Sequence, residues 1–134
     1  MAQAALAHLG RWAAGGEAPP SGPSLERNGD KTGYVLDEHG IARGGIRTPW
    51  VDVPTAVMGG LGQTGETFAM LFGRTEPFDD DTLSKLYPGG EDEYLDRFAA
   101  SLDAAIAAGF LLEQDRIEIL AVAAHSFPLR LADG

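Results

Sequence analysis

Residues 44–54, with the sequence GGIRTPWVDVP, constrain the fold of this chain more than any other segment. Pro49 and Pro54 push the residues before them toward extended backbone, because the proline ring clashes with a helical conformation at the preceding position. The two glycines at the start adopt backbone angles that other residues avoid. The segment therefore fits neither a regular helix nor an ordinary strand, and it predicts a specified irregular path through a folded protein.

The length and composition limit the size of that protein. A chain of 134 residues is one domain at most, and it buries roughly two thirds of its unfolded surface on folding. Its hydrophobic content of 44% is ordinary, whereas 18 glycines and 8 prolines indicate much irregular structure. The chain has no cysteine, so disulfides and thiolate metal sites are excluded.

The charge is acidic and uneven. A net charge of −10 argues against nucleic acids and anionic membrane surfaces as partners. Residues 76–103 carry nine acidic side chains against Lys85 and Arg97, a net charge of −7 in one stretch. We interpret this stretch as a solvated face, with an acidic docking surface as the alternative. No apolar run approaches a membrane span of about 20 residues, and the first residues lack a basic leader, so a cytoplasmic location is the default expectation.

The apolar spacing predicts a mostly α-helical chain with irregular extended segments, and it places helices near residues 2–14, 81–87, 91–108 and 115–125. In the first helix Leu6, Leu9 and Ala13 recur at helical spacing, Trp12 borders their stripe, and glycines at 15 and 16 end the helix. Residues 17–78 are rich in turn residues, with short extended candidates at 34–37 and 54–58 and a helical turn or packed loop at 67–72.

The C-terminal helices have predicted caps and faces. Asp80 or Asp81 is a candidate N-cap of the short helix, and acidic residues 91–93 suit the first turn of the longer one. Asp115 and Glu118 have the spacing of a capping box for the last helix. The expected buried stripe of the long helix is Leu95, Phe98, Leu102 and Ile106. The expected apolar face of the last helix is Ile117, Leu120, Ala121 and Ala124.

Motifs for cofactors and metals are weak. Residues 60–65 match G-x-G-x-x-G, but Gly73 and Pro77 leave no room for the long helix that a dinucleotide site needs. Acidic residues 79–81 lack the glycine that a calcium loop has at its sixth position. The histidines, at positions 8, 39 and 125, have no metal-ligand spacing. We therefore expect no metal and no cofactor.

No catalytic serine is apparent, because none of the five serines sits in the G-x-S-x-G elbow of an α/β-hydrolase. His39, two residues after Asp37, is open to interpretation as a base with an orienting carboxylate, although a turn residue is the simpler interpretation. Arg47 is the best isolated binding candidate, for a substrate carboxylate or an acidic partner. We favour a structural role, in which Arg47 bonds to loop carbonyls or pairs with Asp52.

An ordered set of short motifs runs along nearly the whole chain. Its centre is Asp37, Gly40, Gly44, Gly45, Arg47, Pro49, Asp52 and Pro54, preceded by Leu9, Trp12, Gly15, Pro19 and Pro20 and followed by residues 71–78 (LFGRTEPF), 86–88 (LYP), 108–112 (AGFLL) and Asp115. This set resembles the C-terminal region of a bacterial family of large α/β-hydrolase-domain proteins. The resemblance implies that the chain is a single partial domain spanning residues 1–134.

In that family the nucleophile and the catalytic histidine precede the region matched here. The resemblance therefore implies that residues 1–16 are the last helix on the hydrolase sheet, that 17–78 wrap the body and that 79–134 form a helical end. It implies an esterase-like whole that is inactive without its hydrolase core, with that core or a second copy of the chain as partner. A free-standing acidic interaction module and a small enzyme using Asp37, His39 and Arg47 are the alternatives. We expect residues 34–78 to be loosely held in the isolated chain.

Overall fold

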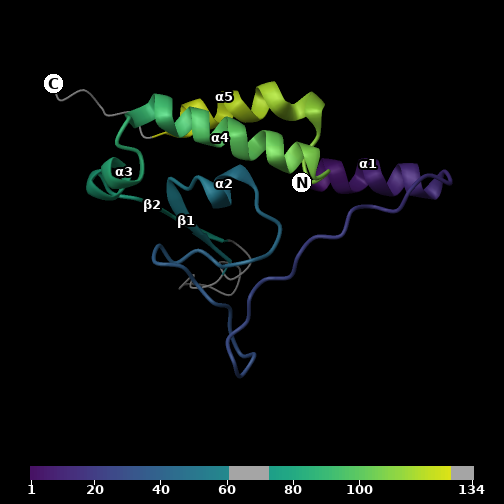
Figure 1. Ribbon diagram of the computed structural model, residues 1–134, viewed down its shortest axis with the longest axis horizontal. Coiled ribbons are helices and arrows are strands. Elements are labelled where there is room, and N and C mark those ends of the chain that lie inside the picture. The colour runs from purple at the N-terminus through teal and green to yellow at the C-terminus, as the bar shows by residue number, and fades with distance from the viewer. Residues whose placement is uncertain (61–72, 128–134) are drawn as a thin grey trace.

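The computed structural model describes residues 1–60 and 73–127. These ranges contain four helices of seven residues or more, one helical turn, a 3-10 turn and two short strands, joined by irregular segments (Figure 1). In chain order the elements are α1 (Ala2–Ala13), α2 (Pro49–Asp52), β1 (Ala56–Gly59), β2 (Arg74–Pro77), α3 (Asp80–Leu86), α4 (Gly90–Ala107), the 3-10 turn (Glu113–Asp115) and α5 (Arg116–Ser126). The mostly α-helical composition with irregular segments is confirmed, and the four predicted helices are present.

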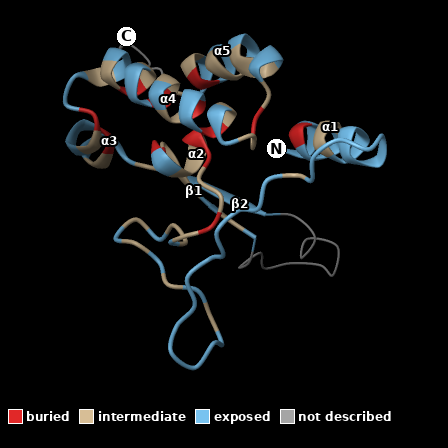
Figure 2. Ribbon diagram, turned by 45° about the vertical axis from the view of Figure 1, so that its right-hand side comes forward, coloured by how far each residue is buried: buried red, intermediate tan, exposed pale blue. Residues whose placement is uncertain are grey.

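The helical half holds the core. Helices α4 and α5 pack side by side, and α2 and α3 lie against them (Figure 1). Aromatic rings fill the centre: Tyr94 lies 5.3 Å from Tyr87 and 5.6 Å from Phe98, and Trp50 from α2 meets Phe98 edge-on at 5.2 Å. A second cluster of Leu102, Ala105 and Leu111 joins the end of α4 to the following turn. Figure 2 shows that buried residues concentrate in this half.

Two buried tyrosines make the fold sensitive to alkali. Burial raises the pKa of Tyr87 and Tyr94 to about 12, from an ordinary value of 10.0. Between these values the unfolded chain loses protons that the native chain retains, so stability is full below pH 10 and falls as the pH rises toward 12. We expect the urea midpoint to be clearly lower at about pH 11 than at about pH 9. Equal midpoints would contradict the burial of both hydroxyls.

The segment at 44–54 contains one helical turn, so the expectation that it holds no helix was wrong. Pro49 occupies the first position of α2, where its fixed φ suits a helix and its missing N–H is not needed. The expectations for Thr48 and the glycines hold: Thr48 is extended, with φ −103° and ψ 161°, and Gly44 and Gly45 have φ near +72°. Val53, before Pro54, has φ −129° and ψ 65° at the end of α2 and is not extended as expected. A Cβ at Gly44 would lie 2.7 Å from the Ser24 carbonyl oxygen, so glycine is required there.

Two predicted caps were wrong. The N-cap of α3 is Asp79, one residue before the predicted pair, and hydrogen bonds from the Thr82 side chain and backbone lower the pKa of its carboxyl. Asp115 makes no capping bond, because its backbone is already helical in the 3-10 turn that precedes α5. An N-cap needs an extended backbone to turn its side chain toward the first N–H groups.

The predicted faces were right for α4 at its centre and only partly right for α5, where Leu120 packs on the core and Ala124 is half-buried. Phe98 and Leu102 are fully buried, but Tyr94 and Ala105 complete the stripe in place of the half-buried Leu95 and Ile106. In α5 the 3-10 turn sets a different rotation, so Ala123 is buried and Ile117 is 82% exposed. The inward side chains of α5 are Ile119, Leu120 and Ala123, and the predicted Ala121 is exposed.

The irregular region before α2 folds back on itself. Three isolated bridges, Leu25 with Gly44, Arg27 with Tyr34 and Leu36 with Ala42, tie three short stretches to one another. The extended candidate at 34–37 is thus extended, and the candidate at 54–58 corresponds to β1. β1 pairs antiparallel with β2, which the sequence analysis did not predict, in the register Ala56 to Pro77. The predicted turn or loop at 67–72 lies outside the described residues.

Candidate functional site

Helix α1 turns its apolar side away from the rest of the described chain. The side chains at positions 4, 8 and 11 share one face because residues three and four apart are neighbours on a helix. That face meets the chain at Ala4, which is 2% exposed, and at His8, which bonds to Gly109, while the exposed Arg11 bonds to His8 within the helix. Leu6 and Leu9 lie farther around the helix and are 68% and 51% exposed, and Trp12, which borders the inward face next to His8, is 53% exposed. The predicted apolar stripe exists, but nothing in the described residues covers it.

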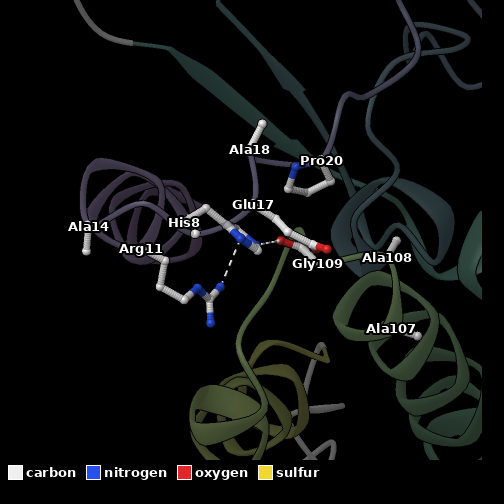
Figure 3. A pocket seen from close by; sticks show the side chains of 10 residues that line it. His8, Arg11, Ala14, Glu17, Ala18, Pro20, Ala107, Ala108 and Gly109 are labelled. Carbon is white, nitrogen blue, oxygen red and sulfur yellow. Dashed lines mark hydrogen bonds between the residues drawn. The ribbon is translucent and has the colours of Figure 1, made fainter.

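His8 connects α1 to the end of α4. Its Nε2 lies 2.8 Å from the Gly109 carbonyl oxygen, and its Nδ1 lies 2.8 Å from Arg11 Nη2 (Figure 3). Gly109 follows the last residues of α4 with a φ of +81°, which places its carbonyl toward α1. A helix that shares few other contacts with the body is therefore held by a side-chain hydrogen bond at its middle turn.

An open cleft of about 830 Å³ lies beside this contact, between α1 and the end of α4. Its walls are mostly small residues, and its polar groups are His8, Arg11 and Glu17 (Figure 3). Residues at the C-terminal ends of both helices line it, Ala14 after α1 and Ala107 and Ala108 at the end of α4, and helix C-termini carry partial negative charge. The cleft thus combines a histidine and an arginine with an acidic side chain, and no single sign of charge dominates it.

Arg47 braces the GGIRTPWVDVP segment. Its Nε donates to Asp52 Oδ1 at 2.6 Å, and its two terminal nitrogens donate to the carbonyl oxygens of Ala42 and Val51 at 3.2 and 3.3 Å. Ser101 on α4 donates to the other Asp52 oxygen at 3.3 Å, which ties the segment to the helical half. Both groups that the sequence analysis proposed for a structural Arg47, loop carbonyls and Asp52, are its partners in the structure.

Arg47→Lys should lower stability by about 1 kcal/mol, because an ammonium cannot reproduce three directed bonds to separate acceptors. The Arg47 and Asp52 side chains are 36% and 38% exposed, so solvent screening keeps the loss modest. Urea unfolding of the variant and the wild type would measure it, with Arg43→Lys as the control, since Arg43 makes a longer, more exposed ion pair. An unchanged midpoint for Arg47→Lys would contradict a structural role.

His39 would need a bond from its imidazole to the Asp37 carboxylate to act as the base suggested by the sequence. Asp37 Oδ1 accepts from the backbone N–H groups of His39 and Ile41, both at 2.9 Å, and so closes a turn. The His39 ring packs 5.4 Å from the Phe78 ring. The Asp37 carboxylate therefore bonds to backbone N–H groups, and the structure gives it no bond to the His39 imidazole. Arg47 bonds to Asp52 and to the carbonyl oxygens of Ala42 and Val51.

The described residues offer no group of three or more His, Asp or Glu side chains that could hold a metal ion. Most of the glycine-rich match at 60–65 lies outside the described residues. Within ranges 1–60 and 73–127, no helix is long and apolar enough to span a membrane.

Sequence reasoning identified Arg47 and its segment but missed His8, for which it noted only that the spacing of the histidines does not suit a metal site. The available signal was the spacing of His8 and Arg11, which puts two polar side chains on one face of an otherwise apolar helix. Its partner, the backbone oxygen of Gly109, has no sequence signature, and a separation of 101 residues hides the pair.

Comparison with known proteins supplies the family. The sequence profile of the alpha/beta hydrolase domain matches residues 1–121, about nine tenths of the chain. No curated protein and no solved structure matches this chain. The match includes α1, the braced segment and the start of α5. The chain belongs to the alpha/beta hydrolase domain family.

Proposed function

We propose that this chain is the C-terminal portion of a bacterial α/β-hydrolase-domain protein that hydrolyses carboxylic esters. In this account α1 covers the hydrolase sheet and the following residues wrap the body, with the GGIRTPWVDVP segment as the family's structural motif. The nucleophile and the catalytic histidine belong to the remainder of the hydrolase, here called the hydrolase core, because this chain carries no G-x-S-x-G elbow.

The outward apolar face of α1 is the observation that carries this proposal. A helix in a folded protein turns its apolar stripe toward the core, yet here Leu6 and Leu9 face away and are more than half exposed, while Ala4 and His8 face the chain. In α/β folds the helices cover both faces of a large sheet, and the described sheet has two strands only. The family assignment and the uncovered face together support a sheet of the hydrolase core as the occupant.

Other occupants fit less well. A membrane-surface helix carries Lys and Arg along its polar face, whereas α1 has Arg11 alone in a chain of net charge −10. A second copy of the chain could cover the same face, and a symmetric dimer would then form without any hydrolase core. If the chain were a free-standing interaction module, the isolated chain should unfold cooperatively.

Ester hydrolysis with and without the hydrolase core tests the proposal. A longer family member, expressed without the segment equivalent to residues 1–121, would supply the core, co-expressed with this chain carrying an affinity tag. We expect the core to copurify and the complex to hydrolyse a simple aryl ester, while this chain alone shows no turnover. Alanine at the core's nucleophilic serine should abolish that turnover. Failure to recover the core, or turnover by this chain alone that His39→Ala abolishes, would contradict the proposal.

A further inference from the structure

We infer that His8, held by Arg11 and bonded to Gly109, is a positioning residue that fixes α1 in the orientation in which its apolar face is presented to the hydrolase core. The identity of the partner, the hydrolase core, rests on the proposed function. The contact of His8 with Arg11 and Gly109 rests on the geometry alone. The three residues are called the His8 latch below.

The donors and acceptors of the His8 latch form one directed chain. Arginine has only donors, so His8 Nδ1, 2.8 Å from Arg11 Nη2, must be the acceptor. The imidazole proton then resides on Nε2, which donates to the Gly109 oxygen at 2.8 Å. Arg11 thus selects the tautomer that bonds to Gly109, and the ring is fixed at both nitrogens (Figure 3).

Gly109 fits its role because a side chain would occupy the place of the ring. A Cβ at this position would lie 3.2 Å from His8 Nε2 and 3.2 Å from Pro20 Cγ, and the φ of +81° disfavours any other residue. The carbonyl that receives His8 is also just past the end of α4, where carbonyl groups lack helical partners. The bond therefore satisfies an acceptor that the end of α4 leaves available.

Helix α1 depends on this bond because its other attachments are small. Among the described residues, His8 to Gly109 is the one side-chain hydrogen bond between α1 and the helical half. Elsewhere α1 borders an apolar hollow with Ile46 and Phe110, and at Gln3 it borders a second hollow shared with α5. An isolated helix of 12 residues is marginal in water. Without the latch, α1 should fray and its outward face should lose a fixed direction.

The latch and the proposed interface do not compete. His8 is on the face that meets the chain, whereas Leu9 lies about 100° and Leu6 about 160° around the helix from it. A partner on the outer face therefore leaves both hydrogen bonds in place. The latch sets the position of α1 before the core arrives, and such preorganisation raises affinity by lowering the entropy lost on binding.

Amide exchange of the free chain tests the latch directly. In His8→Ala the amides of residues 2–13 should exchange about tenfold faster, the effect of losing one to two hydrogen bonds on local opening. His8→Gln should stay close to the wild type, because its amide N–H reaches the Gly109 oxygen from a similar place. His125→Ala, at an exposed histidine near the end of α5, is the matched control. Unchanged exchange in His8→Ala would overturn the inference.

Recovery of the hydrolase core tests the consequence. We expect His8→Ala and Gly109→Ala each to recover about tenfold less core than the wild type, and His8→Gln to recover nearly as much. Full recovery with both alanine variants would overturn the positioning role while leaving the proposed function standing. If the wild-type chain recovers no core but His8→Ala still exchanges faster, the proposed function fails and the contact itself survives.

Discussion

Replacing both Leu6 and Leu9 with aspartate should abolish the complex with the hydrolase core and leave the free chain folded. Both side chains are more than half exposed in the structure, so the fold of the chain does not depend on them. Burying each leucine at an interface is worth about 2 kcal/mol, and an unpaired carboxylate in the same place costs more. The affinity should therefore fall by about a thousandfold or more.

A matched control comes from α5. Ile117 is 82% exposed on a helix that the proposed interface does not use, and Ile117→Asp should bind the core like the wild type. Copurification of the core measures binding, and circular dichroism of each free variant confirms its fold. Full recovery of the core by the Leu6 and Leu9 double variant would contradict the assignment of this face to the hydrolase sheet.

Phe98→Ala should destabilise the helical half by about 3–5 kcal/mol, the usual cost of deleting a buried phenylalanine. Phe98 is fully buried and touches rings from two elements, Trp50 of α2 and Tyr94 of α4. The free energy of unfolding of a small domain is only about 5–15 kcal/mol in total. The variant should therefore lose most of its cooperative unfolding transition. Urea unfolding followed by far-UV circular dichroism would measure the loss.

The tryptophans add a local readout to that experiment. Trp50 packs edge-on against Phe98, whereas Trp12 is half exposed on α1. The near-UV signal of the free chain should therefore come mainly from Trp50 and disappear in Phe98→Ala. As a control, Ile117→Ala should change stability by less than about 0.5 kcal/mol, because it removes an exposed side chain. A Phe98→Ala midpoint equal to that of the wild type would mean that the ring cluster is not the core.

The helices were predictable because each has local signals. The helical spacing of apolar residues, the glycines at 15 and 109 and the acidic first turn of α4 each lie within or next to the helix that they indicate. The one-turn helix α2 was missed because Pro49 breaks a helix from within but begins one well. The predicted buried faces of α4 and α5 were partly wrong, because the rotation of each helix about its axis depends on the 3-10 turn that links them.

The candidate site was harder to predict because its contacts are distant in sequence. Arg47 and Asp52 are five residues apart, so their pairing was among the stated alternatives. The bond from His8 to Gly109 joins residues 101 positions apart and ends on a backbone atom. The stripe on α1 was predicted correctly as a stripe, but a sequence does not say whether the surface that covers it belongs to the same polypeptide. In the structure, the described residues leave Leu6, Leu9 and Trp12 of this stripe more than half exposed.

Amide exchange of residues 2–13, measured in the chain alone and in its complex with the hydrolase core, tests the central claim most directly. The account predicts that α1 exchanges readily in the free chain, where only Ala4 is buried, and becomes strongly protected in the complex. Equal exchange in the two states, with protection appearing elsewhere on the chain, would contradict the claim that α1 is the helix that covers the hydrolase sheet.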